Sequence, residues 1–247
     1  MHPGDVGLFS DLDGTLSEIV DDPDAVVPVP SAAECLGALA GHLGTVAIVS
    51  GRPVSFLERF FAPPIVLSGL YGLEHRAGNR LLIDPTAVEW QHVMSRAADR
   101  AREEFGLEGV EDKRYSITVH YRGMTNDFTQ RVTSWARSIA DETGLDARPA
   151  KMSVELHPPT SRSKGDAVED MARPLRSAIY LGDDVGDLPA FERLEQLHAS
   201  GVLDSYAVVL VAGDETPPEL RAHATDVVSS PSDVAAILHK LLEAAST

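Results

Sequence analysis

The architecture of this chain can be worked out from one stretch, Val6-Gly7-Leu8-Phe9-Ser10-Asp11-Leu12-Asp13-Gly14-Thr15-Leu16. An apolar run ends here in two carboxylates and a glycine, which predicts a buried strand that leads into an exposed turn. Residues two apart in an extended chain face the same side, so Asp11 and Asp13 are expected to share a pocket while Leu12 points to the core. Gly14 lets the chain leave the strand without a Cβ clash.

Two carboxylates this close indicate metal-dependent chemistry, because each disfavours ionisation of the other. A divalent cation removes that conflict, and Mg²⁺ prefers hard carboxylate oxygens. One carboxylate can then attack a phosphorus atom while the other handles protons. The alternative is an acidic turn without chemistry, since Asp-x-Asp alone is common. The apolar strand before the pair and the Gly-Thr-Leu after it favour the functional interpretation.

The same stretch resembles the nucleophile motif, Asp-x-Asp-Gly-Thr, of the haloacid dehalogenase-like (HAD) phosphohydrolases. Its extension from Asp11 to Pro23 is similar to that of the trehalose-6-phosphate phosphatases within that superfamily. The resemblance covers nearly the whole chain. It implies an α/β fold, a doubly wound parallel sheet with an inserted α+β cap domain.

The composition agrees with a soluble globular protein: of 247 residues, 43% are hydrophobic and 24% are charged. The net charge of −17 argues against nucleic acid and anionic membrane surfaces as partners. The single cysteine, Cys35, rules out an internal disulfide. The amino terminus shows no signal-like region and no stretch approaches the length of a membrane span, so we expect a cytoplasmic protein.

A second apolar run, 45–49, ends in Ser50-Gly51-Arg52-Pro53. Ligands bind at the carboxyl edge of open α/β sheets, where a hydroxyl and free amides suit a phosphoryl oxygen. On its own Ser50 would be taken for a helix N-cap. In this order after the aspartate pair, Ser-Gly-Arg resembles the second family motif, which implies that Ser50, Gly51 and Arg52 bind phosphate.

The segment Ser163-Lys164-Gly165-Asp166 predicts a helix start, because serine with an aspartate three residues later is typical of a capping box. Lys164 then lies in the first helical turn, where the helix dipole disfavours a cation. That conflict indicates an anionic partner, a phosphate or a carboxylate. The segment resembles the third family motif, which implies that Lys164 binds phosphate.

Three carboxylates follow another apolar strand, in the run Gly182-Asp183-Asp184-Val185-Gly186-Asp187. Carboxylates at the carboxyl end of a strand provide further metal ligands. The run resembles the fourth family motif, which implies that Asp183 binds the metal with Asp184 and Asp187 in support.

From about residue 84 the pattern changes. Residues 115–122 and 151–156 alternate with period 2, which predicts half-exposed antiparallel strands. We therefore expect a HAD-like core of residues 1–77 and 158–247, with an α+β cap, residues 78–157, that determines substrate specificity.

Charged residues gather in the cap, and ordinarily they would be a solvated sheet face. The resemblance implies that several hold the sugar: Glu111, Lys113, Arg122, Lys151 and Glu155. Glu74, in the core, lies where the family carries Gly-x-His-Gly-x-Glu and is a further substrate-binding candidate. Strict alternation puts Lys113 on the opposite face from Arg122, so either the strand begins after Lys113 or a bulge intervenes.

The resemblance implies a phosphoric monoester hydrolase that converts trehalose 6-phosphate to trehalose and phosphate in trehalose biosynthesis. Asp11 would be the nucleophile and form an aspartyl-phosphate. Asp13 would protonate the leaving sugar oxygen and then activate water. Mg²⁺ would be held by Asp11, the Asp13 backbone carbonyl and Asp183, while Ser50 and Lys164 bind the phosphoryl oxygens.

Two alternatives stay open. One is a related phosphatase for sucrose phosphate or glucosylglycerate phosphate, because Tyr71 stands at the family's histidine and Gly186 and Leu188 replace its threonine and glutamate. The other is a non-catalytic partner of a sugar-phosphate synthase, which the intact motifs disfavour. The expected partner is a small sugar phosphate, with no nucleic acid and no membrane; a functional link to a trehalose-phosphate synthase is a further expectation.

Overall fold

The computed structural model describes residues 2–20, 22–150, 152–213 and 216–246. The chain forms two compact units, Met1–Leu82 with Arg162–Thr247 (the core unit) and Ile83–Ser161 (the inserted unit). The sequence places the domain boundaries after residues 77 and 157. The structure divides a few residues later, because β4 (Glu74–Ala77) and β5 (Arg80–Ile83) form a hairpin in the sheet of the core unit.

The core unit is built on an eight-stranded sheet of described residues, with the order β12-β11-β10-β1-β2-β3-β4-β5. Its other strands are β1 (Val6–Ser10), β2 (Thr45–Val49), β3 (Val66–Gly69), β10 (Ser177–Gly182), β11 (Ser205–Val211) and β12 (Asp226–Val228). The strands from β12 to β3 are parallel, and β4 runs antiparallel to β3. The strand order reverses around β1, which creates the switch point where open α/β sheets bind ligands.

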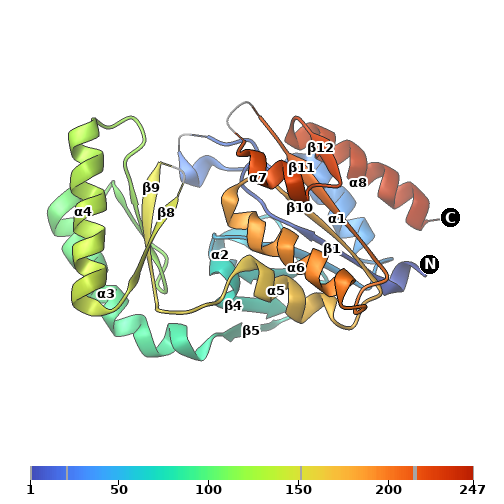
Figure 1. Ribbon diagram of the computed structural model, residues 1–247, viewed down its shortest axis with the longest axis horizontal. Helices are drawn as coiled ribbons and strands as arrows, with labels where there is room; N and C mark the ends of the chain where they lie inside the picture. The colour runs from blue at the N-terminus through green and yellow to red at the C-terminus, as the bar shows by residue number, and fades with distance from the viewer. Residues whose placement is uncertain (1, 21, 151, 214–215, 247) are drawn as a thin grey trace. The chain divides into compact units, whose positions relative to one another are not determined.

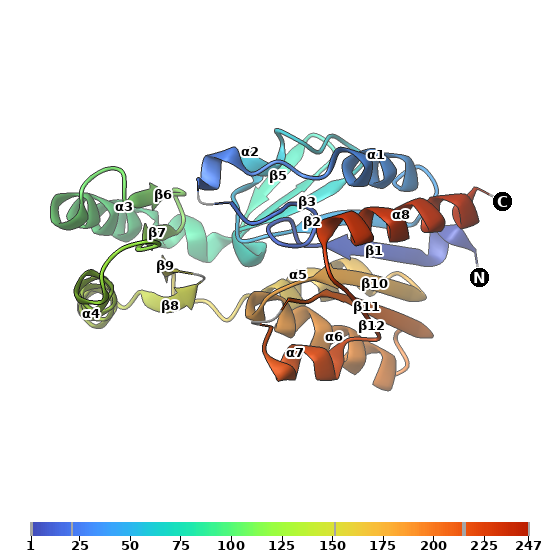
Figure 2. The same ribbon diagram turned by 90° about the horizontal axis from the view of Figure 1, so that it is seen from above.

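Helices cover both faces of this sheet. They are α1 (Pro30–Leu39), α2 (Val54–Leu57), α5 (Lys164–Ala172), α6 (Leu188–Ala199), α7 (Pro218–His223) and α8 (Pro231–Ala245), with 3-10 turns η1 (Pro3–Asp5), η2 (Pro23–Ala25), η3 (Leu70–Gly72) and η4 (Val185–Asp187). Figure 2 shows α1 and α8 on one face and α5 and α6 on the other. Successive β1 residues follow this division: Leu8 packs with the α1 and α8 cluster, and Phe9 with the α5 and α6 cluster. The predicted doubly wound arrangement is confirmed.

Three neighbouring parallel strands end at the same edge of the sheet. In register, Ser10 of β1 lies beside Leu181 of β10 and Ile48 of β2. The residues that follow, Asp11 and Ser50 among them, therefore leave the sheet side by side. This edge brings the first, second and fourth sequence motifs together.

The inserted unit is an antiparallel sheet with two helices, α3 (Pro85–Phe105) and α4 (Asn126–Thr143), the green helices of Figure 1. Its strands are β6 (Val110–Asp112), β7 (Ile117–His120), β8 (Asp146–Ala150) and β9 (Ser153–His157), in the order β6-β7-β9-β8. One face packs Ile117, Val119, Val154 and Leu156 with the helices, which leaves Thr118 and Glu155 on the other. Within the described ranges, no helix combines the length and apolar character that crossing a bilayer requires.

Candidate active site

Asp11 and Leu12 leave β1 in opposite directions, as the alternation predicts. Leu12 is fully buried in the core, whereas the Asp11 side chain lies at the carboxyl edge. The Asp11 backbone N–H donates to the Leu181 carbonyl oxygen at 2.9 Å, so β10 fixes the position of the residue. Asp11 is only 4% exposed, so its carboxylate depends on protein neighbours for compensation.

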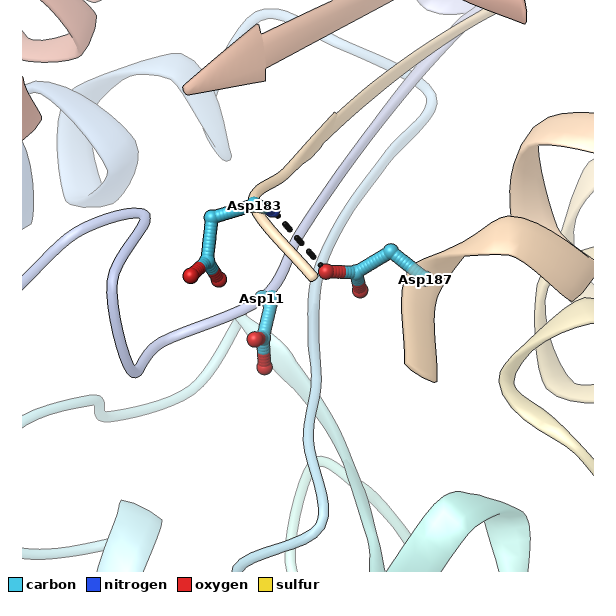
Figure 3. A group of neighbouring side chains, drawn as sticks. All are labelled: Asp11, Asp183 and Asp187. Atoms are coloured by element: carbon cyan, nitrogen blue, oxygen red, sulfur yellow. Dashed lines mark hydrogen bonds between the residues drawn. The ribbon is translucent and has the colours of Figure 1, made fainter. Parts of the chain in front are cut away.

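Asp11, Asp183 and Asp187 form an acidic group in which each offers a carboxylate oxygen within 4.8 Å of the others. Figure 3 shows the Asp11 side chain between those of Asp183 and Asp187. A Cβ on Gly14 would lie 2.1 Å from Asp183 Oδ2, so glycine is required for this approach. Oxygen donors at this spacing could hold a divalent metal ion.

Lys164 is the first residue of α5, and the predicted capping box of Ser163 and Asp166 is present. The Lys164 Nζ lies 2.7 Å from Asp187 Oδ1 and 3.1 Å from Asp11 Oδ1. The cation predicted to need an anionic partner therefore has two carboxylates.

The pKa values of this group reflect burial and mutual charge. Burial raises the pKa of Asp11 well above its ordinary value, Lys164 lowers it only in part, and Asp187 raises it further. Burial alone would lower the pKa of Lys164, but Asp11 and Asp187 outweigh it and hold that pKa well above its ordinary value. Negative charge is in excess here, which favours a bound cation.

Tyr180, in β10, also reaches the acidic group but is not among the site residues expected from the sequence. Its hydroxyl donates to Asp187 Oδ1 at 2.7 Å, and the ring is fully buried. The signal was present in the sequence, since a buried tyrosine in an aliphatic strand usually finds a partner for its hydroxyl.

Asp13 has a different partner from the one its spacing suggests. The sequence predicts that Asp11 and Asp13 point into one pocket, where each carboxylate disfavours ionisation of the other. In the structure, both Asp13 carboxylate oxygens accept hydrogen bonds from Arg52, from Nε at 3.0 Å and Nη2 at 2.8 Å. The carboxylates that raise the pKa of Asp11 belong to Asp187, Asp183 and Asp184.

Ser50 and Gly51 follow β2 at the same edge. The Ser50 side chain is buried, and its hydroxyl accepts the Arg52 backbone N–H at 3.1 Å. A Cβ on Gly51 would lie 2.8 Å from the Tyr71 ring. Tyr71 itself has a left-handed backbone, with φ 57°, and a Cβ on Gly186 would lie 3.7 Å from its ring. Two departures from the family pattern, Tyr71 and Gly186, are therefore neighbours.

Glu74 lies in β4 and is buried. Its Oε2 accepts the backbone N–H of Val54, the first residue of α2, at 2.6 Å. Since the N-cap residue, Pro53, supplies no side-chain hydrogen bond, Glu74 provides the acceptor for a backbone N–H in the first turn of this helix.

Glu155 is the centre of a polar network in the inserted unit. Its Oε1 lies 2.7 Å from Lys113 Nζ and accepts the Thr118 hydroxyl at 2.8 Å, while Oε2 lies 3.1 Å from His157 Nε2. Burial alone would raise the pKa of Glu155, but Lys113 and His157 outweigh it and hold the pKa well below its ordinary value. Glu155 is thus an ionised, buried carboxylate.

The other sugar-site candidates lie around this network. Glu111 of β6 is 3.1 Å from His120 and 4.0 Å from Lys113. Lys113 precedes β7, in a turn where Arg114 has φ 70°, so the strand begins after Lys113. Arg122 lies in an exposed turn after β7. Lys151 lies outside the described residues.

Comparison with known proteins supplies the family. The trehalose-phosphatase family model matches residues 9–217. The trehalose-phosphate phosphatase of Mycobacterium leprae is 34% identical over 211 residues, 79% of this chain and 49% of that protein. That of Mycobacterium avium is 34% identical over 214 residues, 81% of this chain and 54% of that protein. The chain thus spans about half the length of these curated relatives.

A solved structure, of a protein related to trehalose-6-phosphate phosphatase, shares the fold. Its TM-score is 0.81 at 22% identity, and the match covers 96% of this chain and 97% of that one. The family model, which spans most of the sequence, includes all four motifs gathered at or beside the core-unit edge. The chain belongs to the trehalose-phosphatase family.

Proposed function

We propose that this chain is a Mg²⁺-dependent phosphatase that hydrolyses trehalose 6-phosphate to trehalose and phosphate. The observation that carries the proposal is the buried Asp11 carboxylate, 3.1 Å from Lys164 Nζ, at the carboxyl end of β1 in a member of this family. The names of the relatives supply the substrate.

Asp11 acts as the nucleophile in this proposal. Its carboxylate oxygen attacks phosphorus, the bond from phosphorus to the sugar oxygen breaks, and Asp13 gives that oxygen a proton. Asp13 then takes a proton from the water that attacks the aspartyl-phosphate, which releases phosphate and restores Asp11. Arg52 donates to both Asp13 oxygens, so it orients this carboxylate at the edge of the sheet.

The donor set suits Mg²⁺, since it consists of oxygen atoms only and Gly14 leaves space for the Asp183 carboxylate. Asp11, the Asp13 backbone carbonyl and Asp183 would hold the ion, with Asp184 and Asp187 in support. When bound, the ion supplies positive charge beside the phosphoryl group. Lys164, Ser50, Gly51 and Arg52 bind the phosphoryl oxygens, where charge spreads in the transition state.

The distal sugar is the proposed ligand of the inserted unit's polar residues. Glu155 is ionised and held by Lys113 and Thr118, so it is a fixed acceptor for a sugar hydroxyl. The remaining proposed contacts are Glu74, Glu111, Lys113, Arg122 and Lys151.

A substrate panel tests the proposal. Phosphate release is measured from trehalose 6-phosphate, sucrose phosphate and glucosylglycerate phosphate, with Mg²⁺ and after exhaustive chelation. We expect the highest kcat/KM on trehalose 6-phosphate, loss of activity on chelation, and recovery with Mg²⁺. A matched variant, Asp11→Asn, keeps the side-chain shape without the attacking carboxylate, and its turnover should fall by about three decades or more.

A higher kcat/KM on another sugar phosphate would identify that ester as the preferred substrate. The panel includes such esters because Tyr71 and Gly186, which differ from the family pattern, are neighbours. No release from any ester would favour a non-catalytic partner of a synthase. The synthase link and the cytoplasmic location stay predictions from the sequence.

A further inference from the structure

Asp187 is fully buried and uses both carboxylate oxygens. Its Oδ1 accepts from Lys164 Nζ and the Tyr180 hydroxyl, each at 2.7 Å. Its Oδ2 accepts the backbone N–H groups of Asp183 at 3.0 Å and Asp184 at 3.2 Å. An ionised carboxylate offers about four acceptor positions, so these four donors fill it. Asp187 thus joins Lys164 to the loop that carries Asp183.

The two donors on Asp187 Oδ1 differ in what else they touch. Lys164 Nζ also lies 3.1 Å from Asp11 Oδ1. Tyr180 is fixed by packing, its ring meeting Phe191 edge to face at a centroid distance of 5.7 Å. The hydroxyl is therefore a stationary donor, and the ammonium is shared between two carboxylates.

We propose that Tyr180 is a positioning residue: its hydroxyl compensates part of the negative charge on Asp187 Oδ1, which leaves the Lys164 ammonium directed toward Asp11 and the phosphoryl group. Without the hydroxyl, the fully buried Asp187 Oδ1 keeps Lys164 as its one hydrogen-bond donor among the described residues, and the ammonium is drawn onto Asp187. This inference rests on the proposed role of Lys164 in binding the phosphoryl group.

The experiment compares Tyr180→Phe with a control on the same strand. Phenylalanine removes one oxygen and keeps the packing on Phe191. The control is Ser177→Ala, which removes a hydroxyl that lies 2.8 Å from Ser205 Oγ at the opposite end of β10. Two quantities are measured: kcat on trehalose 6-phosphate and on a small aryl phosphate, and the rise in thermal unfolding midpoint that inorganic phosphate produces with Mg²⁺ present.

We expect Tyr180→Phe to lower kcat roughly tenfold on both esters and to weaken phosphate binding by a similar factor. The Mg²⁺ concentration for half-maximal activity should stay unchanged, because the hydroxyl contacts Oδ1 and the Asp183 loop is held by Oδ2. In an Asp187→Asn background the same substitution should add less than twofold, since the tyrosine acts through that carboxylate.

Unchanged kcat and phosphate binding in Tyr180→Phe would overturn the inference. An equal loss of kcat and phosphate binding in Ser177→Ala would also overturn it. So would a double variant in which the effects of Tyr180→Phe and Asp187→Asn simply add. Phosphate binding requires no turnover and no sugar, so it separates this inference from the proposed function. If trehalose 6-phosphate is not hydrolysed but Tyr180→Phe still weakens phosphate binding, the proposed function fails and the positioning role stands. If the wild type does not bind phosphate, the positioning role is wrong.

Discussion

Arg52 holds Asp13 with two hydrogen bonds, from Nε to Oδ2 at 3.0 Å and from Nη2 to Oδ1 at 2.8 Å. Such paired charge-assisted bonds are among the strongest that side chains form, and they fix the orientation of both groups. Arg52 is also a proposed phosphate ligand. A phosphoryl group can therefore compete with Asp13 for the same guanidinium, so substrate binding and release of Asp13 are coupled.

Substitution of Arg52 tests this coupling. Arg52→Lys keeps the charge but cannot form the paired geometry, and Arg52→Ala removes both. We expect KM to rise by about tenfold in Arg52→Ala and by less in Arg52→Lys, because a charge-assisted hydrogen bond contributes roughly 1.5–3 kcal/mol. The measurement is kcat and KM on trehalose 6-phosphate, with Arg59→Ala as an exposed control on the same segment. An unchanged KM in Arg52→Ala would remove Arg52 from phosphate binding.

Glu155 should make stability depend on pH. Because its pKa is held below the ordinary value, its ionised form stabilises the fold at pH above the pKa of an unfolded-chain glutamate, about 4.3, and that contribution is lost as pH falls toward the folded pKa. Replacement by glutamine removes the contribution. We expect Glu155→Gln to reduce the free energy of unfolding by about 2 kcal/mol at neutral pH, with a difference from wild type that shrinks below pH ~4. Urea unfolding across this range checks the sign, and a difference that grows on acidification would contradict the assignment.

Substitution of Arg122 distinguishes a role in sugar binding from a role in the stability of the inserted unit. It lies in an exposed turn after β7, whereas Glu155 is buried in β9. Arg122→Ala should therefore leave the unfolding midpoint unchanged while lowering kcat/KM on trehalose 6-phosphate by about one decade. Activity on a small aryl phosphate should change little, because that ester lacks the distal sugar. An equal fall in kcat/KM on both esters would mean that Arg122 has a structural role. No fall on either ester would mean that Arg122 is a solvated surface residue without a role in sugar binding.

The sequence predicts the edge of the core sheet well, because Asp11, Ser50 and Asp183 each follow an apolar run and parallel strands end together. It does not predict which groups pair there. Arg52 and Asp13 are 39 residues apart, and the choice between Asp11 and Arg52 as the neighbour of Asp13 depends on side-chain rotamers. Tertiary packing, rather than local pattern, decides such contacts.

The polar network of the inserted unit shows the same limit. Alternation alone puts Lys113 and Arg122 on opposite faces, but the left-handed Arg114 turns the backbone between β6 and β7 and frees Lys113 from that pattern. Its partner, Glu155, lies 42 residues away. Thr118 donates to the same carboxylate and His157 lies against it, a set of contacts that the pairing of β7 with β9 brings together.

The last prediction concerns Tyr71 and Gly186, which the sequence identifies separately as departures from the family pattern. A Cβ on Gly186 would lie 3.0 Å from Asp184 Oδ1, which is tight, and 3.7 Å from Tyr71 Cε1, which is ordinary contact, so the ring leaves little space for the additional γ atoms of a threonine. Gly186→Thr alone should lower kcat/KM and the unfolding midpoint, because overpacking forces neighbours off their rotamers at a cost of about 1–3 kcal/mol.

Tyr71→His replaces the phenol ring beside Gly51 with a smaller imidazole, which leaves more space for the threonine. The double variant Tyr71→His/Gly186→Thr should recover at least about half of the midpoint lost in Gly186→Thr, a coupling expected only of residues in contact. The control pairs Gly186→Thr with Tyr206→His, which changes a tyrosine on β11 that packs beside His198. Equal recovery with either histidine would contradict the contact. Recovery with Tyr71→His but not with Tyr206→His would show that the two departures compensate each other. The relative kcat/KM of the double variant on different sugar phosphates would then show whether the pair also determines substrate preference.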